Sequence, residues 1–248
     1  MPPENESTPE QGLIDRYTPF LEEIRKRVRW FAFIFLGFGI LGFVYYEQIV
    51  NLSLRLFRFE GVNIAFTSPF QFINLAFSSG LAVGLIAALP LAIIQIINFL
   101  KPALNKKEYR VMITLMPLAI LLFAGGFFYG VAVMKYVISL LYQKALELEI
   151  GNILDISALL SQIITTSALL GAAFEFPLIL TGMMRLKFID YGAVAAKRTT
   201  VYFICLVFAS FLPPTDLLSL ALLTLPLIFL FETTLFLNRT VLKTTGKE

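Results

Sequence analysis

Histidine is absent from the 248 residues, and cysteine occurs once, at Cys205. Without histidine, neither a Ser-His-Asp triad nor the usual imidazole ligands of a metal site can form. A single cysteine has no partner for an intrachain disulfide, so it says nothing about the redox compartment. The sequence also lacks a phosphate-binding loop of the GxxxxGK[ST] pattern. We therefore expect neither an enzyme nor a protein with a metal or other cofactor.

Charge is scarce as well, with 15% of residues charged and 58% hydrophobic. A soluble domain of this size needs many more surface charges, so the sequence predicts an integral membrane protein surrounded by lipid. Apart from one acid, six stretches are free of charge: residues 30–46, 61–100, 111–134, 156–184, 199–215 and 217–231. A span needs roughly 20 apolar residues, and the polar first third of the second stretch is typical of a loop. We predict an all-α, polytopic fold with six transmembrane helices.

Basic residues are distributed unequally between the two sides of this arrangement. With six spans, both termini and the loops after the second and fourth spans share one side, which holds 16 of the 20 Lys and Arg residues. The other side holds Arg55, Arg58, Lys135 and Lys144. By the positive-inside rule, both termini are predicted to be cytoplasmic. The net charge of +3 thus reflects topology and gives no support for a nucleic-acid partner.

Three regions follow from this pattern. Residues 1–15 are polar and acidic, without the apolar core of a cleaved signal peptide, and are predicted to form a disordered cytoplasmic arm. Residues 16–238 form the six-helix transmembrane domain, and residues 239–248 form a cytoplasmic tail.

The last two predicted helices are short, with 17 and 15 uncharged residues. Pro213 and Pro214, in the connecting "LPPTD" that ends at Asp216, cannot continue a helix and predict a tight outer turn. Two short helices thin the bilayer locally or leave that corner submerged. Prolines within the spans predict bent helices and a curved helical wall; they are Pro90, Pro117, Pro177 and Pro226.

Two glycine pairs, Gly80/Gly84 and Gly126/Gly130, have the spacing that permits close approach of helices. We interpret both as packing contacts within the chain, with an oligomer contact as the alternative.

Glu175 is the one acid inside a charge-free stretch. It lies ten residues before Arg185, or about 15 Å along a helix, which places it near the membrane midplane. An ionised side chain there costs about 3 kcal/mol or more, so the carboxyl must face the protein interior, be neutral or contact water. One interpretation is a neutral carboxyl bonded to carbonyls that Pro177 leaves free; the other is a polar cavity used in transport.

Two further acids lie on the predicted cytoplasmic rim. Glu23 is four residues before Arg27, a spacing that allows a simple ion pair along one helix. Glu108 falls in the first turn predicted after Pro102, where a negative charge suits the helix dipole. These structural explanations do not say why two acids share a rim that is otherwise basic.

Six fragments in register resemble one family. They are "FLEEIRKR" (20–27), "SPFQF" (68–72), "FLKPALNKKEYR" (99–110), "FEFP" (174–177), "PPTDLLS" (213–219) and "PLIFLFE" (226–232). Their order and spacing resemble TatC, the multispanning subunit of the twin-arginine protein translocase, over nearly the whole chain.

The resemblance implies that the chain binds the Arg-Arg signal peptides of folded proteins and supports their transport driven by the proton gradient. It implies single-span partners of the TatA and TatB kind and self-association in a larger complex. The family's two signal-receiving acids correspond to Glu23 and Glu108. The signal-peptide site is then predicted to comprise Glu23, Arg25, Arg27, Phe99, Pro102, Leu104, Glu108 and Arg110. Gln95 keeps the family's polar residue in the second span and, with Glu175, is predicted to serve inside the membrane.

Two alternatives remain at this point. A proton-coupled secondary transporter of small molecules would use Glu175 as its proton carrier, but the sequence has no evident inverted repeat. A purely structural scaffold is the other alternative, which transport of a folded reporter with an Arg-Arg signal would distinguish.

Overall fold

The computed structural model describes residues 9–57, 63–65, 70–100, 106–147, 153–185, 188–214 and 216–242. The helices are α1 (Pro9–Val44), α2 (Tyr46–Phe57), α3 (Gln71–Leu100), α4 (Lys106–Glu147), α5 (Ile156–Ala173), α6 (Phe176–Arg185), α7 (Tyr191–Ala196), α8 (Arg198–Ser210) and α9 (Leu217–Leu242). Two short strands, β1 (Asn63–Ala65) and β2 (Ile153–Asp155), pair in parallel, with Asn63 opposite Ile153. The predicted all-α, polytopic fold is confirmed, with this strand pair as its one β element among the described residues.

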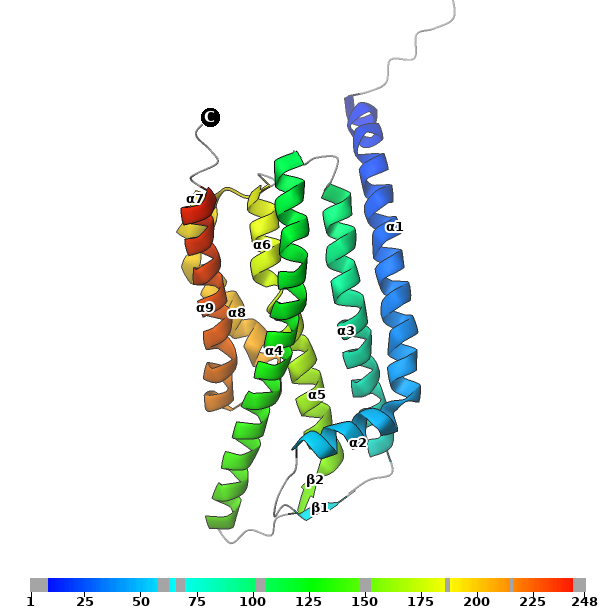
Figure 1. Cartoon of the computed structure of the whole chain (residues 1–248), viewed down its shortest axis with the longest axis vertical. Helices are drawn as coiled ribbons and strands as arrows, with labels where there is room; N and C mark the ends of the chain where they lie inside the picture. Colours follow the sequence, from blue (N-terminus) through cyan, green and yellow to red (C-terminus); the bar gives the residue numbers. More distant parts are fainter. Residues whose placement is uncertain are drawn as a thin grey trace, which may run out of the picture.

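The long helices follow one another across the molecule (Figure 1). α1 packs on α3, α3 on α5, α5 on α4, and α4 and α6 on α9, which also carries α8. At the end that we call the upper end, α1 begins, α3 and α6 end, α4 begins and α9 ends. At the lower end, α2 and the strand pair lie near the start of α5. Both ends of the described chain therefore lie at the upper end.

Buried apolar side chains hold this arrangement together in separate clusters. One cluster joins α4, α5, α8 and α9 through residues such as Val137, Leu170, Ala209 and Leu223, each at most 1% exposed. By contrast, only 6% of the span Arg25–Val44 in α1 is buried. α1 is thus an outer helix, attached mainly through α3.

Glycines allow the closest helix contacts. A Cβ atom at Gly80 would lie 2.8 Å from the carbonyl oxygen of Gly39 in α1, and one at Gly130 would lie 2.7 Å from the Cα atom of Ser167 in α5. Gly84 and Gly126 would meet Phe35 and Phe174 at 2.9 Å and 2.6 Å. The interpretation of both glycine pairs as packing contacts within the chain is confirmed.

Five stretches of the described chain are long and apolar enough to span a membrane: Arg25–Val44, Gln71–Leu89, Met116–Lys144, Ser157–Met184 and Leu217–Thr240. α8 is apolar but has 13 residues, so it is short, as predicted, and the count of six spans stays a prediction. α9, in contrast, was predicted to be short and has 26 residues. The prediction stopped at Glu232, but a single charged residue does not end a helix.

Two other boundaries differ from prediction for a related reason. α4 continues through Lys135 and Lys144 to Glu147, well beyond the charge-free stretch. α1 begins at Pro9, so residues 9–15 are helical where we predict a disordered arm, while residues 1–8 lie outside the described residues. Charge marks where a helix leaves the apolar region, not where the helix ends.

Candidate functional site

An open groove of about 850 Å³ lies at the upper end, between α1 and the last turns of α3. We call it the upper groove; its lining residues are Glu22, Arg25, Lys26, Arg27, Arg29, Trp30 and Gln95. Four of these seven residues are basic and one is acidic, so the described lining is strongly cationic. The basic rim predicted from the sequence is therefore a concave surface rather than a flat one.

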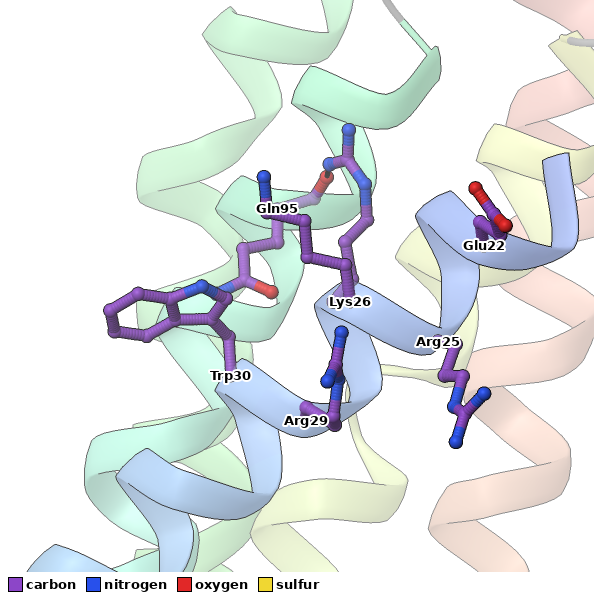
Figure 2. Close-up of a pocket in the computed structure, with 7 residues that line it drawn as sticks. Glu22, Arg25, Lys26, Arg29, Trp30 and Gln95 are labelled. Carbon is purple, nitrogen blue, oxygen red and sulfur yellow. Dashed lines mark hydrogen bonds between the residues drawn. The ribbon is translucent and has the colours of Figure 1, made fainter. Parts of the chain in front are cut away.

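Helix geometry explains which side chains meet in the upper groove. Glu22, Lys26 and Arg29 are spaced four and three residues apart, which puts them on one face of α1. Arg27 donates a hydrogen bond from Nη1 to the backbone carbonyl of Gln95, tying α1 to α3. In Figure 2, Lys26 extends toward Gln95 with Trp30 beside it, whereas Arg25 points away.

The predicted signal-peptide residues fall into three groups. Arg25 and Arg27 line the upper groove, together with Gln95, which was predicted to serve inside the membrane with Glu175. Arg110 is exposed near the start of α4 and does not line it. Pro102 and Leu104 lie outside the described residues, as do the side chains of Glu23, Phe99 and Glu108.

The backbone positions of the two predicted acids are nevertheless defined. Glu23 lies in α1, one turn before Arg27, and Glu108 is the third residue of α4. Both positions belong to helix segments at the upper end (Figure 1). The roles of these acids in binding stay predictions.

Glu175 is buried, with 2% of its surface exposed, in the turn between α5 and α6. There its N–H donates to the carbonyl of Ala172 at 3.1 Å. Pro177 has no N–H for the carbonyl of Ala173, which explains why the helix is interrupted here. Glu175 Oε2 has no hydrogen-bond partner among the described residues. A neutral carboxyl donates from one oxygen only, so both interpretations of Glu175 stay predictions.

The turn between α8 and α9 is anchored deep inside the bundle. Thr166, fully buried in α5, donates from Oγ1 to the carbonyl of Pro213 at 2.6 Å. Thr166 is ten residues from the start of α5, so the turn lies roughly 15 Å above that point along the helix. Figure 1 agrees: α8 and the start of α9 stop well short of the lower ends of α4 and α5.

Asp216 caps the start of α9. Its Oδ1 accepts the N–H of Ser219 at 2.9 Å, and its Oδ2 accepts the hydroxyl of the same residue. Burial opposes ionisation of Asp216, but the bonds from the Ser219 side chain and from nearby N–H groups outweigh burial and hold the pKa of this carboxyl below its ordinary value. The described contacts thus assign Asp216 a structural role in the outer turn.

Several residues of these sites were missed by sequence reasoning. Glu22, Lys26, Arg29 and Trp30 line the upper groove, and the four-and-three spacing of the first three could have indicated a shared face. Glu232, the last residue of the "PLIFLFE" fragment, accepts a hydrogen bond from the Tyr202 hydroxyl and lies 3.5 Å from Arg198 Nη1. No local pattern could have found this cluster, because Glu232 is 30 residues from Tyr202.

Comparison with known proteins assigns the family. Residues 19–226 match the sequence model described as Sec-independent protein translocase protein (TatC). The TatC protein of Listeria innocua is 28% identical over 236 residues, covering 93% of this chain and 94% of the relative. TatCy of Bacillus subtilis is 26% identical over 231 residues, covering 88% of this chain and 87% of the relative.

A solved structure agrees with these matches. The crystal structure of the twin-arginine translocase receptor TatC in DDM superimposes with a TM-score of 0.76 at 25% identity, covering 88% of this chain and 98% of that chain. The match does not favour a secondary transporter of small molecules. The chain belongs to the TatC family and is a membrane-spanning subunit of the Sec-independent, twin-arginine protein translocase, not an enzyme.

Proposed function

We propose that this chain receives the Arg-Arg signal peptides of folded proteins at the cytoplasmic face of the inner membrane. Together with TatA- and TatB-like single-span subunits, and through self-association, it supports their transport driven by the proton gradient. Family membership supports this proposal, as does the name of the solved relative, which is called a receptor.

The upper groove is the observation that carries the proposal. It is an open cavity at the end where α1, α3 and α4 meet the predicted cytoplasm, and Glu23 and Glu108 belong to helix segments beside that end. A carboxylate binds the planar guanidinium group through two parallel hydrogen bonds, which lysine cannot reproduce. The described cations of the groove oppose a dicationic ligand, so binding depends on these two acids.

Glu175 is proposed to act in a step after docking. Its burial in an interrupted helix, with one oxygen lacking a described partner, supports a polar site inside the membrane. Buried polar groups without partners are rare in proteins and are concentrated where function requires them.

The test is photo-crosslinking of an Arg-Arg signal peptide to the full chain in membranes. A hydrogen bond to a charged group contributes about 1.5 to 3 kcal/mol, so Glu23→Gln and Glu108→Gln should each weaken crosslinking roughly tenfold or more. A Lys-Lys peptide should crosslink poorly to the unaltered protein.

Glu47→Gln is the matched control, because it removes one carboxylate from α2 at the lower end. It should leave crosslinking unchanged. Undiminished crosslinking in the Glu23→Gln/Glu108→Gln double variant would overturn the docking assignment.

A further inference from the structure

Exposed side chains form a stripe along α1 below the upper groove. They alternate four and three residues apart: Lys26, Arg29, Phe33, Leu36, Ile40 and Phe43. This spacing keeps them on one face of a helix. Its apolar members are far from buried, with Phe33 71% and Ile40 62% exposed. The α1 stripe changes from cationic to apolar between Arg29 and Phe33, within a single turn.

Two further hollows lie along the α1 stripe, between the upper groove and the lower end. Below the upper groove, a second hollow of about 410 Å³ shares Lys26, Arg29 and Trp30 with it and adds Phe33. A third, of about 330 Å³, lies between α1 and α3 and is lined by Leu36, Ile40, Phe43 and residues of α3 such as Phe77. A cationic opening is therefore followed along α1 by two hollows with apolar side chains, the lower of which lies against α3; we call these two hollows the apolar track.

The two cations at the top of the track are available to a ligand. Both Lys26 and Arg29 are exposed, and in the part of the chain that the structure describes neither belongs to an ion pair. Trp30 lies beside them, and tryptophan favours the level where lipid headgroups meet hydrocarbon. The order along α1 is cations, then an indole, then apolar side chains. It matches the order of phosphate headgroup, interface and acyl chains in a phospholipid.

We propose that the upper groove and the α1 stripe bind an anionic phospholipid while no signal peptide occupies the groove. Lys26 and Arg29 contact its phosphate and the acidic part of its headgroup beside Gln95, and its acyl chains lie along Phe33, Leu36 and Ile40. Basic hollows between transmembrane helices favour such headgroups. A zwitterionic lipid fills the apolar track equally well but leaves one cation without an anion. A partner helix fits the apolar part, yet it needs an acidic residue at the level of Lys26 and Arg29.

Trp30 provides a direct readout, because it is the only tryptophan in the sequence. The full chain is reconstituted in nanodiscs of phosphatidylcholine with rising fractions of phosphatidylglycerol brominated on its acyl chains, and Trp30 fluorescence is measured. We expect quenching to saturate at a low fraction of brominated phosphatidylglycerol. Brominated phosphatidylcholine, in the reverse mixture, should quench only in proportion to its abundance.

Removing the two cations should remove the preference. Each basic residue near an anionic lipid contributes about fivefold in affinity, so the Lys26→Gln/Arg29→Gln variant should lose roughly 25-fold of the preference for phosphatidylglycerol. The matched control is Lys197→Gln/Arg239→Gln, which removes the same charge at the same end of the molecule, from the exposed ends of α8 and α9. It should keep the preference. Native mass spectrometry of retained phosphatidylglycerol gives a second measurement of the same difference.

Three outcomes would overturn the proposal. The first is equal quenching by the two brominated lipids in the unaltered protein. The second is an undiminished preference in the Lys26→Gln/Arg29→Gln variant. The third is that neither lipid quenches Trp30 in the protein purified with its other subunits, which means that a partner helix occupies the track. No signal peptide is present in this assay, so its failure and the failure of peptide docking are separate results.

Discussion

At the scale of single residues, the buried carboxyl of Glu175 is expected to lower the stability of the fold. The carboxyl is 2% exposed, and Oε2 lacks a hydrogen-bond partner among the described residues. Leaving a buried polar group without a partner costs about 1 to 3 kcal/mol. An apolar side chain at this position would avoid that cost, which is the basis for the prediction that follows.

Glu175→Leu should therefore raise the free energy of unfolding, by about 1 kcal/mol or more, while impairing transport. Thermal unfolding in detergent measures the first effect, and transport of a folded reporter with an Arg-Arg signal measures the second. Signal-peptide crosslinking should persist, because the proposed role follows docking. If the variant fails to accumulate in the membrane, Glu175 is a packing residue.

The residue scale also marks the limit of sequence reasoning about the upper groove. Arg25, Arg27 and Gln95 were predicted as site residues and line it, whereas Glu22, Lys26, Arg29 and Trp30 were not. The acid of the family motif is Glu23, whereas Glu22 lies on the helix face that carries Lys26 and Arg29. The contact between α1 and α3 is a tertiary contact. Arg27 and the Gln95 carbonyl are 68 residues apart in the sequence, so no local sequence pattern predicts their hydrogen bond.

At the scale of helices, close packing of α4 on α5 depends on a position without a side chain. Gly130→Ala would bring a Cβ atom to 2.7 Å from the Ser167 Cα atom, which forces the helices apart. We expect a loss of about 1 to 3 kcal/mol in the free energy of unfolding. Gly125→Ala is the matched control in the same helix, because nothing lies within 4 Å of its Cβ position. Alanine favours a helix, so this control should be neutral or slightly stabilising; equal losses in both variants would contradict the packing argument.

The start of α9 gives a second prediction at this scale. Asp216→Ala removes the cap of the helix and should cost about 1 kcal/mol, whereas Asp216→Asn keeps an oxygen acceptor and should cost less. The contribution of the ionised carboxyl has a defined pH dependence, because the folded pKa lies below the ordinary value. It is complete above the unfolded pKa of about 4 and is lost as the pH falls through the folded pKa.

Thermal unfolding between pH 7 and pH 2 tests both statements. The stability difference between the unaltered protein and Asp216→Ala should shrink only at the acid end. A difference that shrinks between pH 7 and pH 5 would exclude Asp216 as its source.

Helix identity was predictable from the sequence, but helix ends were not. Long apolar runs locate the cores of α1, α3, α4, α5, α6 and α9 because a membrane span must bury them in lipid or protein. The same runs misplace the ends of α4 and α9, since helices continue past Lys144 and Glu232. The β1–β2 pair joins segments about 90 residues apart. Each strand has only three residues, which is too short for a sequence pattern to reveal it.

For the whole molecule, the distribution of basic residues makes a topological prediction. Single cysteines replacing exposed Arg25 or Arg239 at the upper end should react with a membrane-impermeant maleimide only from the cytoplasmic side. Cysteines replacing exposed Arg55 or Lys144 at the lower end should react only from the opposite side. Cys205 is buried and can be changed to alanine to give the background. Labelling of Arg25 and Arg239 positions from different sides would refute a shared location of the termini.

The helices of the bundle differ in length, and the side formed by α8 is the shortest along the bundle axis. Thirteen residues of helix extend about 20 Å, against roughly 30 Å of hydrocarbon. The Thr166 hydroxyl holds the adjoining turn roughly 15 Å above the start of α5. Lipid tails beside α8 must therefore shorten or splay, while those beside α4 need not. The bilayer is distorted less when two short protein surfaces share the same region of thinned lipid, so hydrophobic mismatch favours association. We therefore expect the bilayer itself to favour an arrangement in which two copies of the chain place their α8 sides next to each other.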